Sequence, residues 1–493
     1  MGIKRYHASK DNTITNAFRA NLSTRGTSSN MGASDILEVF SIYAQASSSS
    51  GLSSELSRVL VQFDTADLTA DRAAGLIPAS GSVSWFLKLY NAKHGQTLPS
   101  NFTLLVKGVS GSWDEGDGLD MEDYTDLGYS NWVSASSTTG WTSAGGDYHA
   151  SPIFSQTFEV GTENLEVNVS SLVEQWLAGT KPNHGFGVFL TSSQENDTTR
   201  SYYTKKFFSR TSEFFFKKPV LEARFNATVK DNRGNFFYSS SLAPAADNLN
   251  TIYLQNTIRG RLANIPSIGT GNIYVSIFSG STAPTGSSLT LVADGTNVTV
   301  GSPTVVTGTY VSTGIYKATF AITAAATPLT TLFDVWHNGN LSTQFFTGSI
   351  VPSTFGASDN QSHSQFLNKI TNLKSIYAPD ELARMRVYSR PRNWSPTIYN
   401  VAKNIPETTV IPSSSFTVFR IVDDLEVIPF GTGSDLETLL SYDVKGNYFD
   451  LDMSMLEPDY SYGIRLAHYN EFNGSWEIQP ETFKFRVEKR QAE

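Results

Sequence analysis

Short apolar segments separated by clusters of turn residues recur along the whole chain, and this pattern restricts the fold more than any other feature. Ser57–Phe63 is an example. Alternation places Val59, Val61 and Phe63 on one face of this segment, as in a β-strand, and Leu60 on the other. The 37 glycines and 19 prolines supply turns, and charged residues, at 17 %, are too few for many solvated helices. We therefore expect an all-β protein.

The length of 493 residues exceeds what one hydrophobic core supports, so we expect several domains. We assign a polar N-terminal docking arm to residues 1–34 and a jelly-roll-like β-sandwich to 35–225. Two smaller immunoglobulin-like β-sandwiches follow at 226–359 and 360–493. The polar stretch 351–364 is the clearest linker.

One short helix is expected within the first sandwich, at Val169–Ala178. Ser170 or Ser171 would cap its N-terminus, and Leu172 and Trp176 would belong to its apolar face.

Charge and cysteine content exclude several classes of function. The net charge is -9 with no strongly basic block, which argues against nucleic-acid binding. The chain has no cysteine, so disulfides, thiolate zinc sites and cysteine nucleophiles are excluded. No apolar signal segment follows Met1, and no stretch of about 18 apolar residues occurs. We expect synthesis in a cytoplasm and no membrane insertion.

The loop Trp113–Asp126 is the strongest candidate for chemistry, because it carries seven carboxylates. Calcium takes about six to eight oxygen ligands, but the spacing is not that of a calcium loop, so we favour a solvated loop and expect no cofactor. The histidines are scattered, without metal-ligand spacing or a Ser-His-Asp pattern. We expect no enzymatic activity; a carboxylate pair that cleaves glycans is the minor alternative.

Aromatic and basic residues suggest two kinds of binding surface. Trp113, Trp132 and Trp141 surround the acidic loop and are our candidates for carbohydrate binding, although burial at the end of a core would produce the same pattern. Arginine and aromatic residues are enriched at protein–protein hot spots. The candidate assembly contacts are Lys4, Arg5, Tyr6 and Phe18 in the arm, and Arg386, Arg390 and Arg392 near the C-terminus.

The region from about Ser34 to Phe225 resembles DNRLRE-type carbohydrate-binding modules. The resemblance rests on ordered motifs, which include Ser57–Phe63, Val83–Tyr90, Ser112–Gly116, Trp132, Trp141, Leu165–Leu177, Asn183–Gly187, Phe207–Arg210 and Pro219–Arg224. It implies a jelly-roll fold. The family carries a Glu after the Ser-Arg pair, whereas Thr211 stands here, and this departure weakens the implied sugar site.

The whole chain is similar to virion structural proteins of marine tailed phages, including those of cyanobacteria. The similarity rests on the segments Met1–Tyr6, Asp11–Phe18, Asn30–Asp35, Trp394–Tyr399, Phe419–Leu425 and Gly446–Asp452. It implies a component of the neck, tail, baseplate or fibre, assembled in the host cytoplasm with other virion proteins and with copies of itself. A capsid decoration protein and an adhesin for host-surface glycans are the alternatives.

Overall fold

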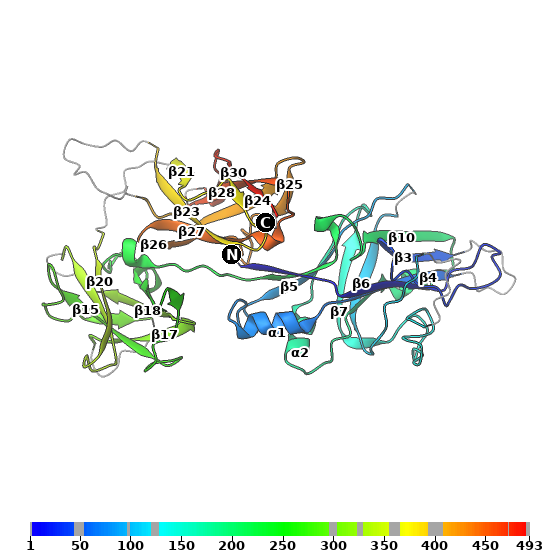
Figure 1. The fold of residues 1–493 in the computed structure, drawn as a ribbon, viewed down its shortest axis with the longest axis horizontal. Helices are drawn as coiled ribbons and strands as arrows, with labels where there is room; N and C mark the ends of the chain where they lie inside the picture. Colours follow the sequence, from blue (N-terminus) through cyan, green and yellow to red (C-terminus); the bar gives the residue numbers. More distant parts are fainter. Residues whose placement is uncertain are drawn as a thin grey trace. The chain divides into compact units, whose positions relative to one another are not determined.

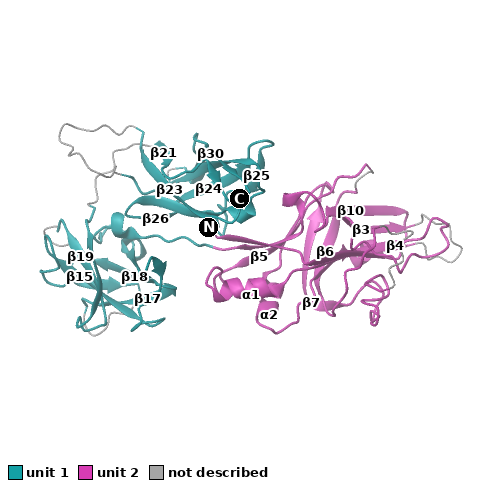
Figure 2. Cartoon of the chain, viewed as in Figure 1, with its two compact units in different colours: residues 1, 226–493 teal, residues 2–225 magenta. Residues whose placement is uncertain are grey.

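A computed structural model describes residues 2–43, 54–95, 99–119, 128–294, 303–322, 329–353, 365–392, 408–471 and 473–489. The chain forms two compact units, Gly2–Phe225 and Asn226–Glu493 (Figure 2). The expected boundary near residue 225 therefore coincides with a boundary of the structure. The expected linker lies mostly outside the described residues, which resume at Gln365.

Gly2–Phe225 is a β-sandwich of two antiparallel sheets (Figure 1). The smaller sheet has the order β1-β11-β5-β8, with strands at Ile3–His7, Val220–Arg224, Ser84–Leu89 and Leu165–Asn168. The larger sheet has the order β10-β3-β4-β9-β6-β7, and β2 also pairs with β4. Its strands are Ser201–Phe208, Ile36–Tyr43, Glu55–Gln62, Phe186–Leu190, Phe102–Val109, Tyr148–Phe158 and, for β2, Lys10–Thr15.

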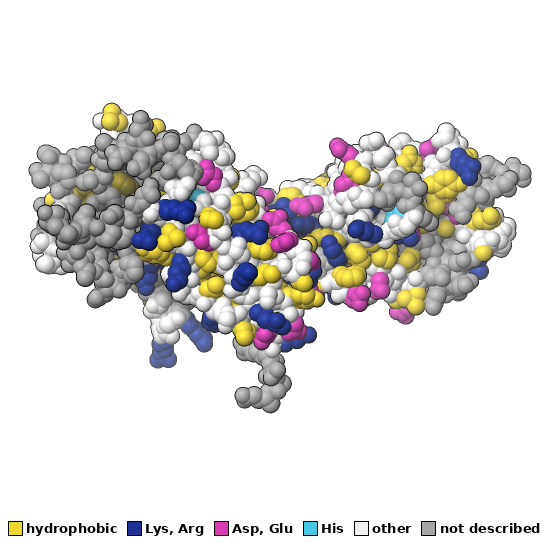
Figure 3. Space-filling model, turned by 90° about the horizontal axis from the view of Figure 1, so that it is seen from above, with side chains coloured by type: hydrophobic (Ala, Val, Ile, Leu, Met, Phe, Trp, Pro, Cys, Tyr) yellow, Lys and Arg dark blue, Asp and Glu magenta, His cyan; other side chains and the backbone are white. Residues whose placement is uncertain are grey.

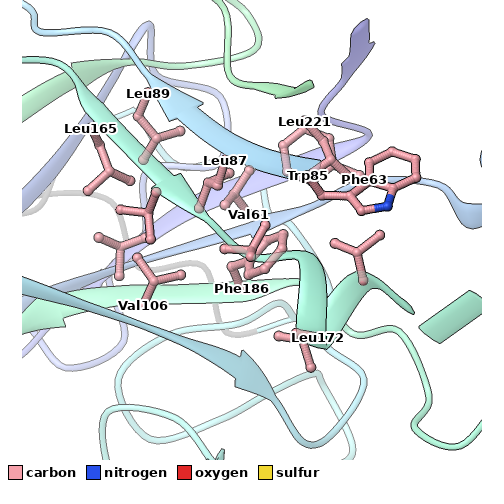
Figure 4. Packing of buried hydrophobic residues seen from close by; sticks show 14 of the residues in the cluster. Val61, Phe63, Trp85, Leu87, Leu89, Val106, Leu165, Leu172, Phe186 and Leu221 are labelled. Atoms are coloured by element: carbon pink, nitrogen blue, oxygen red, sulfur yellow. The ribbon is translucent and has the colours of Figure 1, made fainter. Parts of the chain in front are cut away.

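The main core of this unit lies between the two sheets. Val61 and Phe186 from the larger sheet and Leu87 and Leu221 from the smaller one are fully or almost fully buried in it (Figure 4). Leu60 lies on the opposite face of β4, in a second core with Ile14 and three tryptophans. The predicted alternation in β4 is therefore confirmed, and both faces of the strand are buried.

Helices are few in this unit. The expected helix is present as α2 at Ser170–Leu177 and buries Leu172, Val173 and Trp176. Its predicted serine cap is wrong: the Asn168 carboxamide accepts from the Ser170 amide at 3.0 Å, and the Ser170 hydroxyl accepts from the Trp85 amide. The sequence reading missed α1. The other helices are α1 at Thr65–Ala73, α3 at Ser192–Glu195 and η1 at Phe215–Lys217.

The expected docking arm at residues 1–34 is wrong. Ile3–His7 pairs with β11, and Lys10–Thr15 pairs with β4, so both segments are strands of the first sandwich. Asp11, Asn12 and Thr13 are fully buried despite their polarity. They bond to groups far along the chain: Asp11 Oδ2 accepts from the Arg210 amide at 2.6 Å, and the Asn12 amide donates to the Ser130 hydroxyl at 2.8 Å.

Asn226–Glu493 begins with a second sandwich, in which one strongly bent sheet wraps around a core. β17 causes the bend, because Val306–Gly308 pairs with β15 whereas Thr309–Ser312 pairs with β18. The sheet order is β12-β18-β17-β15-β19-β20, with β16 on β18. The strands are Asn250–Gln255, Ile315–Ile322, Val306–Ser312, Ile273–Ser279, Leu332–His337, Gln344–Ile350 and Leu291–Ala293, with a hairpin of β13 (Thr257–Ile258) and β14 (Arg261–Leu262) and turns η2 (Asn232–Gly234) and η3 (Ala245–Asn248).

A third sandwich completes this unit. One sheet has the order β21-β23-β27-β26, at Phe366–Ile370, Leu382–Pro391, Gly446–Asp452 and Ser441–Asp443. The other has the order β22-β30-β28-β24-β25 with β29 on β28, at Ile376–Tyr377, Phe483–Val487, Ser461–Asn470, Ser414–Arg420, Leu425–Ile428 and Ser475–Ile478; η4 is Met453–Met455. Phe416 and Phe449 stack between the sheets, with ring centroids 4.1 Å apart.

The predicted all-β series of sandwiches is confirmed. None of the helices in the described part of the chain has the length and apolar character needed to cross a membrane.

Candidate functional site

The three candidate sugar-binding tryptophans are core residues. Trp113, Trp132 and Trp141 are only 1 %, 6 % and 9 % exposed, and they pack together in the second core of the first sandwich. The indole of Trp113 donates to the His184 carbonyl at 2.8 Å, and that of Trp141 to the Asn131 carbonyl at 2.8 Å. A sugar ring needs an exposed aromatic face to stack on, so the prediction of a carbohydrate platform here is wrong.

An ion pair attaches the described part of the acidic loop to the first sandwich. Both carboxylate oxygens of Glu115 accept from one edge of the Arg210 guanidinium, through Nε and Nη2, and Glu115 also accepts from the Asp11 amide at 2.7 Å. Thr211, at the family's Glu position, donates its hydroxyl to the Ser34 carbonyl at 2.8 Å. No three His, Asp or Glu side chains of the described residues are grouped to hold a metal ion, and residues 120–127 of the loop lie outside them.

The buried Asp11 carboxyl beside this ion pair has an unusual acidity. Burial raises its pKa to about 7, against the opposing effect of the Arg210 amide, which donates to Asp11 Oδ2 at 2.6 Å. Asp11 Oδ1 is buried and has no hydrogen-bond partner among the described residues. A carboxyl in this setting favours its neutral form.

The predicted contacts of the N-terminal segment are engaged within the first sandwich. Arg5 donates to Glu222 at 2.6 Å, and the Tyr6 hydroxyl donates to Asp71 at 2.6 Å. Lys4 lies 3.6 Å from the same Asp71 carboxylate. The ring of Phe18 is covered by the Arg25 guanidinium, 3.7 Å from the ring centroid. These side chains hold β1 and the loop after β2 in place, and their role as assembly contacts stays a prediction.

Two of the predicted arginines, Arg386 and Arg390, lie on β23 of the third sandwich. Arg392 follows the last residue of that strand, Pro391. Alternation buries Ala383, Met385 and Val387 and leaves Arg386 and Arg390 on the outer face. Arg386 donates to Asp443 at 2.7 Å, and Arg392 donates to Gln365 at 3.3 Å. These residues are on the surface, as a contact role requires. In the view of Figure 3, basic side chains are interspersed with hydrophobic and acidic ones.

A pocket of about 250 Å³ opens between the two sheets at one end of the third sandwich. Its lining includes Phe366, at the start of β21, and the segment Val410–Ser413. His468 and Asn470 from β28, Glu477 from β29 and Gln479, which follows β29, also line it. Tyr469 and Glu471 complete the lining.

The register of β28 and β29 explains why polar side chains enter this pocket. His468 pairs with Glu477, so the two side chains lie on the same face of the sheet. Deeper along β28, this face carries Leu466 and Ile464, which are fully buried in the core. The pocket is therefore the end of the sandwich core, where the inward-facing residues change from apolar to polar.

A buried hydrogen-bond chain fixes the floor of the pocket. The Ser414 hydroxyl lies 2.9 Å from His468 Nδ1, and His468 Nε2 lies 3.1 Å from Asn368 Oδ1. Asn368 Oδ1 also accepts from the Ser389 hydroxyl at 2.7 Å. Because this oxygen is an acceptor, His468 donates from Nε2 and accepts at Nδ1. Burial lowers the pKa of His468 to about 4, so the ring is neutral near pH 7.

Sequence reasoning missed this pocket. Its lining comes from separate stretches, Phe366, Val410–Ser413, His468–Glu471 and Glu477–Gln479, that only strand pairing brings together. The one local signal was the polar pair His468 and Asn470 continuing an apolar strand with the same alternation.

No protein-family model matches the chain, and no curated protein matches it.

Proposed function

We propose that this chain is a non-enzymatic structural component of a tailed-phage virion, part of the neck, tail, baseplate or fibre. Its β-sandwiches would be held in the particle by other virion proteins and by copies of the same chain. The similarity of several segments to marine phage structural proteins supports this location. The lack of cysteine also agrees with assembly in a reducing host cytoplasm.

The observation that carries the proposal is a fixed row of arginines on the outer face of β23. Arg384 and Arg386 both lie over the Tyr448 ring, with each guanidinium 4.6 Å from its centroid. Arg384 pairs with both oxygens of Asp450, at 2.7 and 2.9 Å, and its side chain remains 48 % exposed. An arginine already held in one conformation loses less entropy on binding than a free one. This face therefore has the composition and rigidity of a protein contact surface.

The experiment is mass spectrometry of purified particles of a phage that encodes the chain, with counting of its copies. We expect a fixed copy number set by the symmetry of one substructure, such as a multiple of three, five or six. A count in the hundreds would instead assign the alternative role of capsid decoration. Absence of the chain from purified particles, despite its presence in the lysate, would contradict the proposal.

A charge reversal tests the contact surface itself. Arg386→Glu in the phage genome should reduce the number of copies per particle, because it places a like charge beside Asp443 and interrupts the arginine row. Arg465→Glu is the matched control, since Arg465 is exposed on β28 in the other sheet of the same sandwich. Equal copy numbers for the two variants would show that the β23 face is not a contact surface.

A further inference from the structure

We propose that the pocket at the end of the third sandwich binds one neutral sugar ring, as the terminal residue or a branch of a glycan. This inference is independent of the role in the virion. It rests on the walls, size, charge and rigidity of the pocket.

The lining of the pocket combines two kinds of surface. Phe366, Val410, Ile411 and Pro412 are apolar. Asn470, Glu477 and Gln479 contribute amide and carboxylate side chains that form hydrogen bonds. A pyranose ring is amphipathic in the same way, with C–H groups on its faces and hydroxyls around its edge. Apolar lining with a few oriented polar groups is the usual composition of a small-molecule site.

The size of the pocket limits the ligand to about one ring. Its volume of about 250 Å³ lies just below the range of about 300–1,000 Å³ that is typical of pockets for drug-sized molecules. An extended oligosaccharide would not be enclosed, although the open end of the pocket allows further residues of a glycan to continue into solvent.

The charges around the pocket favour a neutral ligand. Among the described residues, Glu471 and Glu477 lie in the lining, and no lysine or arginine does. His468 adds no positive charge, because burial lowers its pKa. A phosphate or an acidic sugar would therefore be repelled. A cation would be attracted by the carboxylates but would lose hydration against the apolar wall, which costs free energy that a neutral ring does not lose.

The polar wall is held in place before any ligand binds. Glu477 Oε1 accepts from the side-chain amides of Asn470, at 2.8 Å, and Asn473, at 3.1 Å. The Gln479 amide donates to the Glu477 carbonyl at 3.1 Å. Ser414 and Asn368 fix the His468 ring behind these groups. Such fixed side chains lower the entropy cost of binding a small ligand with few contacts.

Saturation-transfer NMR on the full chain tests the proposal. The probes are the methyl glycosides of glucose, galactose, mannose and N-acetylglucosamine, with methyl glucuronide and arginine methyl ester as charged comparisons. We expect transfer to at least one neutral glycoside and none to methyl glucuronide. Transfer to no neutral glycoside, or to arginine methyl ester in preference to all of them, would overturn the proposal.

Two variants locate the binding, and a third controls for folding. Asn470→Trp places a bulky ring in the lining, on the face of β28 that carries His468, and it should abolish binding. Asn470→Ala should weaken binding about three- to tenfold, the effect of one lost hydrogen bond. Ile478→Ala is the control, because Ile478 is 63 % exposed and neighbours Glu477 on the opposite face of β29. Its affinity should equal that of the wild type.

Unchanged binding in the folded Asn470→Trp variant would place the site elsewhere and overturn the assignment. Thermal unfolding of each variant establishes that it is folded. Particle mass spectrometry decides the virion role separately, so failure of either proposal leaves the other standing.

Discussion

Arg233 and Asp334 form a two-pronged ion pair in which the carboxylate is completely buried. Arg233 donates to both oxygens of Asp334, with Nη2 2.7 Å from Oδ2, and the Trp336 indole donates to the same carboxylate at 2.8 Å. Arg233 belongs to a segment that also pairs with the third sandwich, where Asp231 donates its amide to the Tyr442 carbonyl at 3.0 Å. The pair therefore attaches the first residues of the unit Asn226–Glu493 to the second sandwich.

Loss of this arginine should strongly destabilise the second sandwich. Arg233→Ala leaves Asp334 charged and buried without its cation, which typically costs about 3–5 kcal/mol. Hydrogen exchange of peptides that span β19 measures the loss in the full chain. Arg200→Ala is the control, since the Arg200 guanidinium contacts the exposed Tyr202. Exchange in β19 as slow as in the wild type would show that the pair does not support this sandwich.

Glu222 should make the first sandwich sensitive to acid. Burial alone would raise the pKa of Glu222, but Arg5, Lys88 and Arg224 hold it at about 2, below the ordinary 4.5. A carboxyl with a depressed pKa stabilises the fold above its unfolded pKa, and this stabilisation is lost as the pH falls. We expect a loss of about 3 kcal/mol between about pH 4.5 and pH 2.

Glu222→Gln provides the comparison for this prediction. The variant should be less stable than the wild type at pH 7 and should lack this acid-dependent loss. Calorimetry of the full chain at a series of pH values follows the transition that the substitution shifts. Parallel pH profiles for the two proteins would contradict the prediction.

Asp11 should have the opposite effect to Glu222 and destabilise the first sandwich at high pH. Because its pKa is raised from 3.8 to about 7, its neutral form is favoured in the folded state. The contribution of Asp11 to stability is therefore greatest below about pH 3.8 and decreases as the pH rises through 7, by about 4 kcal/mol in total. Asp11→Asn, which is always neutral, should be more stable than the wild type at pH 8 and similar to it at pH 4. Urea unfolding at both pH values measures the difference, and a variant less stable at pH 8 would refute the argument.

Trp141→Ala should unfold the second core without a specific effect on sugar binding. Removal of a buried tryptophan typically costs about 3–5 kcal/mol. Val133→Ala is the control, since Val133 belongs to the same segment and is 46 % exposed. Thermal unfolding measures both. If Trp141→Ala kept full stability and lost glycan binding, the tryptophans would be restored as a binding site.

The fold was predictable where burial follows a local pattern. The alternation of Val59 and Val61 was sufficient to predict β4, and the apolar spacing of Leu172 and Trp176 predicted α2. α1 was missed because it buries only Leu68, although Asp64 caps it and Gly75 follows it. β1 and β2 were missed for a different reason.

The missed N-terminal strands and the pocket depend on distant partners. Asp11 and Asn12 look like loop residues until Arg210 and Ser130 satisfy them. The sequence likewise could not decide whether the three tryptophans bind sugar or pack in a core, because an indole near a loop suits either role. Only the tertiary structure shows the Trp141 indole donating inward to Asn131.

The pairing of β1 with β11 has a consequence for how the first sandwich is made. Arg5 and Glu222 are 217 residues apart in sequence, so β1 leaves the ribosome long before its partner. At about 5–20 residues per second, translation of that interval takes about 10–40 seconds. During this time β1 presents an unpaired edge, and the smaller sheet cannot close. Folding of this sandwich is therefore completed only after its last strand has been synthesised. Until then the exposed β1 segment is accessible to chaperones.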